Sequence, residues 1–287
     1  MVAELRLTVL IEDSVETGDE SRKGLIAKHG LSILVEAKVD DVEVCILMDT
    51  GPSSEALLNN VDVIGVNLRK IDAVMLSHGH YDHTDGLISV LRSAAKRVPV
   101  LAHPKVFSPK FAVEPKLRFI GTAFTLSTVE SAGGVPLLAS NPVKIADGVT
   151  TTGEITRITD YEKVSGFLMV EEDHFIEDFV VDDQALVINL KSKGLVVVTG
   201  CAHAGVVNTI IHAQKIMETE KVCAVLGGFH LIDADDERIQ ATVADLTELN
   251  IGFLGPCHCT GEKATRKLKE AFGDKCQPLK TGDVLRF

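Results

Sequence analysis

The chain has few aromatic residues and no tryptophan. Aromatic side chains make up 5% of the 287 residues, while hydrophobic residues make up 45%. The core must therefore rest on valine, leucine, isoleucine and alanine. A chain of this length can bury a substantial core, and we expect one large α/β domain spanning residues 1–287.

Basic residues are also scarce. The 29 lysines and arginines are outnumbered by 41 aspartates and glutamates, which gives a net charge of −12. Nucleic-acid surfaces need clustered lysine and arginine, and the one basic concentration, 262–269, has the pattern of the solvated face of a helix. We therefore expect no nucleic-acid partner. A small anionic substrate remains compatible with this charge, because bound divalent cations would locally outweigh it.

Long apolar runs are missing as well. The longest stretch without a charged residue, 194–214, contains Thr-Gly, an asparagine and two histidines, which indicates a strand, a loop and a helix rather than a membrane span. Segment 1–6 has no basic region followed by an apolar stretch, so we expect no secretory signal. The six cysteines are not spaced as in a small secreted scaffold, which favours a reducing cytoplasmic location.

The most informative motif is a cluster of histidines directly after an apolar run. Segment 77–86 reads Ser-His-Gly-His-Tyr-Asp-His-Thr-Asp-Gly. Imidazole nitrogens bind divalent transition metals, and a carboxylate can hold a second, harder ion. Four ligands, His78, His80, Asp82 and His83, are too many for one metal that keeps an open position. The spacing predicts two metals about 3.5–4 Å apart that share a water or hydroxide; the alternative is a polar loop with solvated histidines.

Three buried runs further along the chain each end in a histidine. Cys201 and His203 follow a valine-rich run, His230 follows a run that ends in Gly-Gly-Phe, and His258 follows one that ends in Gly-Pro-Cys. Ligands gather at strand ends in α/β sheets because several loops converge there. We expect His203 and His258 to bind metal. His230 is either a ligand or a catalytic residue that contacts substrate, and Cys201 is a soft ligand, an acid–base group or an inert thiol.

These motifs resemble the metallo-β-lactamase superfamily, which carries a dinuclear site on a His-x-His-x-Asp-His loop. Segment 46–51, Ile-Leu-Met-Asp-Thr-Gly, resembles its first motif, in which an aspartate, here Asp49, supports the site by orienting metal-bound imidazoles. Within the superfamily, segments 200–203, 227–230 and 256–261 resemble the branch that contains the dihydropterin–ribofuranosylaminobenzene phosphate synthase of methanopterin biosynthesis. The resemblance covers nearly the whole chain and implies a four-layer αββα sandwich.

The sequence departs from the commoner superfamily pattern at two points. No Thr-Pro-Gly-His-type segment lies between the first motif and residue 200, and Cys201 stands where a bridging aspartate usually follows the strand. Asp182 or Asp183, just before a predicted strand, could compensate, as could His203. The order of the ligands in the second half is therefore left open.

Alternating strand and helix patterns predict an α/β fold. The expected strands are 5–12, 31–39, 42–48, 71–77, 185–191, 194–199, 222–226 and 251–255. One expected helix begins near residue 53, and the others span 86–97, 205–218, 235–248 and 261–272. Between residues 99 and 142 lie six of the nine prolines and four phenylalanines. We expect this segment to be an irregular insert, either a lid that brings Phe107, Phe111, Phe119 and Phe124 over a planar substrate such as a pterin, or a loop packed on the domain or on a partner subunit.

The resemblance implies an enzyme with two divalent metal ions, and mixed histidine and aspartate ligation suits Zn, Mn or Fe. The branch implies that a pterin methyl diphosphate loses pyrophosphate and that the amine of a ribofuranosylaminobenzene phosphate takes its place. His230 or Cys201 could act as acid or base in this reaction and in its alternative. The alternative is metal-dependent hydrolysis of a small phosphoester, ester or lactone. A diiron redox protein and a non-catalytic metal-binding protein are further alternatives, and a homo-oligomer is compatible with the sequence.

Overall fold

The computed structural model describes all residues, 1–287, and most of its strands belong to one large sheet of thirteen strands. In chain order they are β1 (Val2–Ile11), β2 (Ser32–Val39), β3 (Val42–Met48), β4 (Ala73–Met75), β5 (Val98–Ala102), β8 (Gly134–Leu138), β9 (Lys144–Ala146), β10 (Val149–Thr151), β13 (Leu186–Leu190), β14 (Gly194–Thr199), β15 (Val222–Gly228), β16 (Phe253–Cys257) and β17 (Val284–Arg286).

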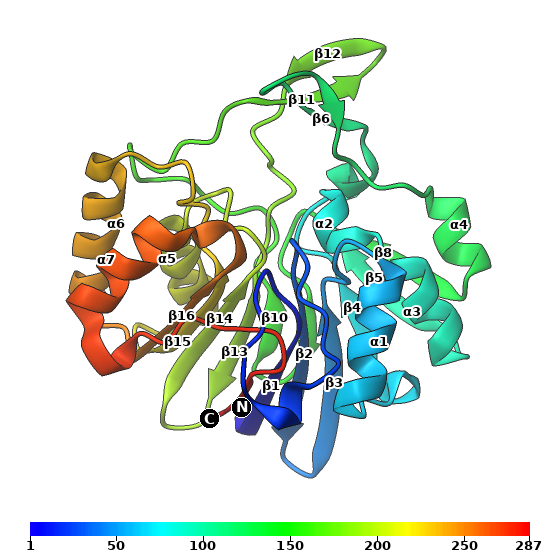
Figure 1. Ribbon diagram of the computed structural model, residues 1–287, viewed down its shortest axis with the longest axis horizontal. Coiled ribbons are helices and arrows are strands. Elements are labelled where there is room, and N and C mark those ends of the chain that lie inside the picture. Colours follow the sequence, from blue (N-terminus) through cyan, green and yellow to red (C-terminus); the bar gives the residue numbers. More distant parts are fainter.

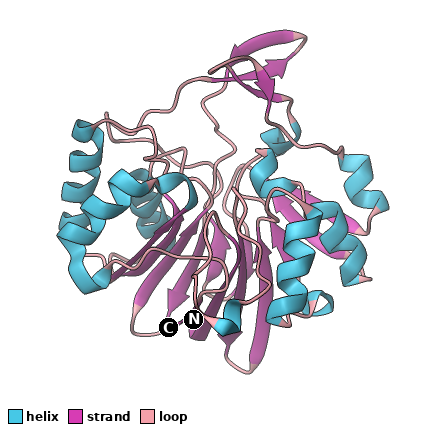
Figure 2. Cartoon of the chain, in the orientation of Figure 1, coloured by secondary structure: helices cyan, strands magenta, loops and turns pink.

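The large sheet is folded into two halves. The strand order is β16-β15-β14-β13-β1-β2-β3-β4-β5-β8. The halves meet where β1 runs parallel to β13 through the pair Val2 and Leu190. Helices cover the outer side of each half (Figures 1 and 2), which confirms the expected four-layer αββα sandwich.

Seven α-helices cover the sheet and its loops. They are α1 (Ser54–Ile64), α2 (Tyr81–Thr84), α3 (Leu87–Ala94), α4 (Leu126–Ser131), α5 (Val206–Met217), α6 (Asp236–Glu248) and α7 (Glu262–Phe272). In Figure 1, α5, α6 and α7 lie outside one half, and α1, α3 and α4 lie outside the other. No helix is both long enough and apolar enough to cross a membrane.

The alternation of side chains along the strands builds three layers of core. Successive residues of a strand face opposite sides of the sheet. In β3, Ile46 and Met48 join the cluster between the two halves, and Leu47 joins the cluster beneath α1 and α3. In β14, Val196 joins the inner cluster and Val197 the cluster beneath α5 to α7. A core of aliphatic residues, expected from the composition, thus fills all three interfaces.

The segment predicted to be an irregular insert at 99–142 is more regular than expected. Its two ends are β5 and β8, which pair in parallel within the large sheet. Between them lie β6 (Lys110–Ala112), β7 (Arg118–Phe119) and α4. With β11 (Phe167–Glu171) and β12 (His174–Glu177), β6 and β7 form a separate four-stranded sheet in the order β12-β11-β6-β7. Figure 1 shows this small sheet at the end of the sandwich away from the two termini.

Candidate metal centre

The candidate ligands lie at the end of the sandwich that the small sheet covers. β14, β15 and β16 are parallel neighbours, and so are β3 and β4. Because parallel strands end at the same edge, the loops after them converge there. The loop after β4 carries the histidine cluster, and the loops after β14, β15 and β16 carry the three later histidines.

Three of the expected ligands, His78, His80 and His203, form one group. Their ligand nitrogens lie within 4.8 Å of one another, and all three side chains are buried. Neither ring nitrogen of His203 has a hydrogen-bond partner, and Nε2 of His80 has none. Buried polar atoms without partners are costly, and a metal ion would satisfy these. The residues therefore fit a metal ion.

Burial also keeps these three imidazoles in the form that binds metal. It lowers the pKa of His80 to about 3, and it holds the pKa values of His78 and His203 well below their usual value. A neutral imidazole has a free lone pair for a metal, whereas a protonated one does not.

The other three expected ligands, Asp82, His83 and His258, form a second group beside the first. Nε2 of His83 lies 3.3 Å from Nε2 of His258. Oδ2 of Asp82 lies 3.4 Å from Nε2 of His258 and 3.8 Å from Nε2 of His83. These three atoms converge on one point. The six residues predicted from the sequence thus fall into two groups of three, and each group could hold one ion.

A carboxylate orients each histidine of the second group. Nδ1 of His83 lies 2.7 Å from Oδ2 of Asp49, and Nδ1 of His258 lies 2.8 Å from Oδ1 of Asp13. A carboxylate on Nδ1 fixes the ring so that Nε2 faces the metal position. Asp49 therefore has the geometry that the resemblance implied. Asp13, which the sequence reasoning missed, sits just beyond the end of β1, and its position next to a strand end is the only signal that could have found it.

We expect Asp49→Asn to lower metal affinity by about 10–100-fold. The fully buried carboxylate of Asp49 accepts hydrogen bonds from the backbone and hydroxyl of Ser77 as well as facing His83. An amide nitrogen in place of one oxygen could not accept, so His83 would lose its orientation. Competition with a chelator measures the affinity. Asp72→Asn is the matched control, because Asp72 accepts from the Cys45 backbone far from the ligands; equal affinities in both variants would contradict the orienting role.

Of the two aspartates that could replace a bridging aspartate, Asp182 is already engaged. Its Oδ2 accepts from the backbone N–H of Gly79 at 2.8 Å, and its Oδ1 accepts from Nζ of Lys110 at 2.8 Å. Asp183 accepts from the backbone N–H of Ala204 through Oδ2, and its buried Oδ1 has no partner. Burial raises the pKa of Asp183 to about 7. Asp183 is thus the one of the pair with a free oxygen.

The two predicted acid–base residues lie at the border of the centre. Sγ of Cys201 is 3.2 Å from Nε2 of His83. The ring of His230 lies 4.1 Å from that of His203, between centroids, and its Nδ1 is buried without a partner. Each residue thus contacts one of the candidate ligands, and the catalytic role of both stays a prediction.

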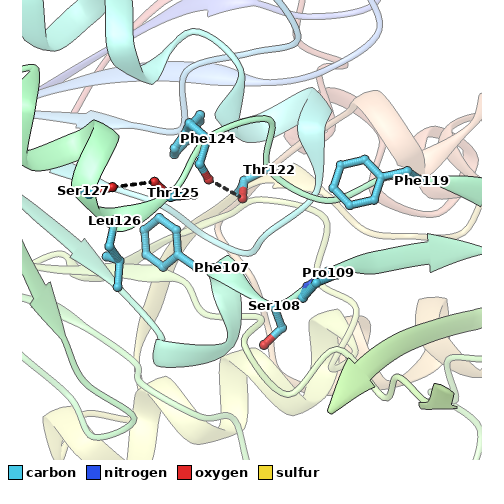
Figure 3. A pocket seen from close by; sticks show the side chains of 9 residues that line it. All are labelled: Phe107, Ser108, Pro109, Phe119, Thr122, Phe124, Thr125, Leu126 and Ser127. Carbon is cyan, nitrogen blue, oxygen red and sulfur yellow. Dashed lines mark hydrogen bonds between the residues drawn. The ribbon is translucent and has the colours of Figure 1, made fainter. Parts of the chain in front are cut away.

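The aromatic ring that faces the histidines comes from outside the expected insert. Phe167, the first residue of β11, has its ring centroid 5.2 Å from that of His80 and 5.5 Å from that of His203. Phe107, Phe119 and Phe124 instead line a cavity of about 550 Å³ in the insert, to which none of the metal-site residues contributes (Figure 3). The ring beside the histidines is thus Phe167, and the lid of insert phenylalanines over a planar substrate stays a prediction.

The chain is similar to known proteins of the β-lactamase superfamily. Residues 45–174 match the family described as the β-lactamase superfamily domain. The chain is 37% identical over 270 residues to the Methanocaldococcus jannaschii protein named 7,8-dihydropterin-6-methyl-4-(β-D-ribofuranosyl)-aminobenzene-5'-phosphate synthase, with 91% of this chain and 90% of that protein covered. It is 32% identical over 248 residues to an uncharacterised protein of the same organism, with 86% of this chain and 90% of that protein covered. The fold is similar to the crystal structure of Tm1679, described as a metal-dependent hydrolase of the β-lactamase superfamily, with a TM-score of 0.81 and 27% identity over 98% of each chain.

Proposed function

The chain is an enzyme of the metallo-β-lactamase superfamily, and we propose that it joins a pterin to an arylamine with release of pyrophosphate. In this reaction the amine nitrogen forms a bond to the methyl carbon of a pterin methyl diphosphate. The carbon–oxygen bond to the diphosphate breaks, the electron pair leaves with the diphosphate, and the amine loses a proton. The relative that is 37% identical over 91% of this chain, named as the corresponding synthase, supports this substrate class.

The observation that carries the proposal is the pair of adjacent ligand groups. His78, His80 and His203 form one group, and Asp82, His83 and His258 form the other. We infer that each holds one divalent ion, with Zn, Mn and Fe compatible with histidine and aspartate ligands. Two such ions would supply the positive charge that stabilises the negative charge developing on the leaving diphosphate.

The surrounding residues prepare this site in three ways. Asp49 and Asp13 orient His83 and His258. Burial of the imidazoles excludes water, which strengthens electrostatic interactions with an anionic substrate. Phe167 presents a ring beside His80 and His203 and could stack on a flat pterin.

A second candidate function is hydrolysis of a small phosphoester, ester or lactone. It is favoured by the similarity to Tm1679, described as a metal-dependent hydrolase, with 27% identity and a TM-score of 0.81. In this reaction water would replace the amine as the attacking group, at the same pair of ligand groups.

The test is pyrophosphate release from dihydropterin methyl diphosphate with and without ribofuranosylaminobenzene phosphate. The protein is purified under reducing conditions, its metals are quantified, and portions are loaded with Zn, Mn or Fe. We expect each of the two ligand groups to hold about one metal, and we expect pyrophosphate release that depends on the arylamine. Release without the arylamine, or cleavage of generic esters instead, would assign the chain to the hydrolases. The absence of both activities in every metal-loaded form would contradict the proposal.

A further inference from the structure

We propose that Cys201, His230 and Cys259 form a third metal site, for a thiophilic divalent ion such as zinc, beside the two groups described above. Their ligand atoms, two sulfurs and an imidazole nitrogen, lie within 4.8 Å of one another. Two thiolates and one imidazole are three of the four ligands of a tetrahedral zinc site, and the fourth position can be taken by water or substrate.

The fold builds this site from three consecutive strands. Cys201, His230 and Cys259 follow β14, β15 and β16, which are parallel neighbours in the sheet. Because these strands end at one edge, each contributes one ligand to the same point. The loops after β14 and β16 also carry His203 and His258, so adjacent residues serve two different metal positions.

Among the three residues, only Cys201 has a side-chain hydrogen-bond partner outside the group, Nε2 of His83 at 3.2 Å. The side chains of Cys201 and Cys259 belong to buried residues, 4% and 6% exposed. Sγ of Cys259 contacts the backbone oxygen of Cys201 at 3.5 Å, which is a weak hydrogen bond for a thiol. Nδ1 of His230 is buried and has no hydrogen-bond partner. A bound ion would engage both sulfurs and a ring nitrogen of His230 together.

The backbone leaves room for the sulfur of Cys259. A Cβ atom at Gly228 would lie 2.6 Å from Sγ of Cys259 and 2.6 Å from the backbone oxygen of Gly200. A side chain at this position would therefore fill the space beside the thiol. Glycine at the end of β15 lets the loops after β14 and β16 approach each other closely.

Cys259 is the cysteine that distinguishes this site from the two groups of histidine and aspartate ligands. Cys201 contacts His83 and also forms a candidate group with His78 and His83, so it lies between the two sites. Cys259 shares a candidate group with Cys201 and His230 alone. The third site also differs in chemistry, since sulfur ligands select Zn over Mn and Mg.

Titration with Co²⁺ tests the proposal on the intact reduced chain. Sulfur ligation gives Co²⁺ a charge-transfer absorption that nitrogen and oxygen ligands do not give. We expect about three bound Co²⁺ per wild-type chain, one of them with this absorption, and about two per Cys259→Ser chain without it. Cys223→Ser, on β15 and outside all the groups, is the matched control and should resemble the wild type. Circular dichroism and retention of the other two ions show that the variant is folded.

Three results would overturn the third site. The first is the same stoichiometry and absorption in Cys259→Ser as in the wild type, which would place Cys201 with His83 or leave it as an acid–base group. The second is a Cys201–Cys259 disulfide in the isolated protein, found as two fewer thiols among the six cysteines. The third is a charge-transfer absorption of Co²⁺ that is weak in the wild type and is the same in His230→Gln. Retention of the absorption in His78→Ala with His80→Ala, after the other ions are lost, shows that the third site stands independently of the proposed function.

Discussion

Lys110→Met is expected to lower the free energy of unfolding by about 3–5 kcal/mol. Nζ of Lys110 lies 2.7 Å from Oδ2 of Asp178 and 2.8 Å from Oδ1 of Asp182, and all three side chains are at most 1% exposed. Without the ammonium group, two buried carboxylates would face each other with no compensating charge. Denaturant unfolding measures the difference in free energy of unfolding between the variant and the wild type. Equal dependence of this free energy on denaturant concentration in both proteins would confirm that their folded and unfolded states are comparable.

The matched control for this variant is Lys105→Met. Lys105 pairs with Glu171 at 3.4 Å, but the two side chains are 36% and 49% exposed. Exposed pairs contribute about 0–1 kcal/mol, so this variant should be near neutral. Adding Asp178→Asn to Lys110→Met should restore part of the lost stability, because one uncompensated charge is removed. Equal effects of the two lysine variants would contradict the role of the buried pair.

The pair also has a defined dependence on pH. Burial disfavours the charged form of Asp182, yet Lys110 holds its pKa below the usual value. The stability from this interaction is therefore present above the unfolded pKa of about 3.9 and is lost as the pH falls through the lower folded value. We expect the difference in free energy of unfolding between the wild type and Lys110→Met to become smaller in that acid range.

This network also connects the small sheet to the metal loop. Lys110 belongs to β6. Asp182, which is fully buried, accepts hydrogen bonds from Nζ of Lys110 and from the backbone N–H of Gly79, between His78 and His80. A Cβ atom at Gly79 would lie 2.2 Å from the backbone oxygen of Val106, so the loop is held closely from that side too. Lys110→Met should therefore weaken metal affinity as well as stability.

His203→Ala is expected to remove one bound metal and to lower turnover by more than the roughly 10–100-fold known for residues that merely orient ligands. His203 is the member of the first group that comes from the second half of the chain. Its ring makes no hydrogen bond within the protein. In the presence of a chelator the variant should therefore unfold close to the wild type, since only packing is lost.

Metal content, turnover and thermal unfolding separate these effects. His174→Ala is the matched control, because His174 lies on the exposed hairpin β11–β12 and contacts the backbone oxygen of Glu172. It should keep full metal content and turnover. A His203→Ala protein that retains both metals and full turnover would exclude His203 from the centre.

Local sequence patterns were sufficient to identify the six residues that we propose as metal ligands. Segment 77–86 holds four of them on one loop, so no knowledge of the fold was needed to group them. His203 and His258 were found because each follows a run that reads as a buried strand, and both strands, β14 and β16, are present. Strand ends are visible in a sequence, because the change from apolar to polar residues marks them.

The middle of the chain was misjudged for a physical reason. Pro99 and Pro136 argue against central strands, yet they lie in β5 and β8. β8 is the last strand in the order of the large sheet, and β4 pairs with β5 only at Val100 and Leu101, so neither proline is required to donate to a neighbour on both sides. The position of a strand in its sheet, which decides whether proline is tolerated, is a tertiary property.

The sequence by itself determined the α/β alternation, the loop with four candidate metal ligands and the residues that end the strands, because each depends on near neighbours along the chain. The tertiary structure decided how the six candidate ligands divide into two groups of three. It also decided that Asp13 meets His258, 245 positions away, that Lys110 neutralises Asp178 and Asp182, and that Phe167 faces the histidines. These contacts depend on which strands are neighbours and on how two sheet halves pack, and such long-range pairing leaves no local pattern in one sequence.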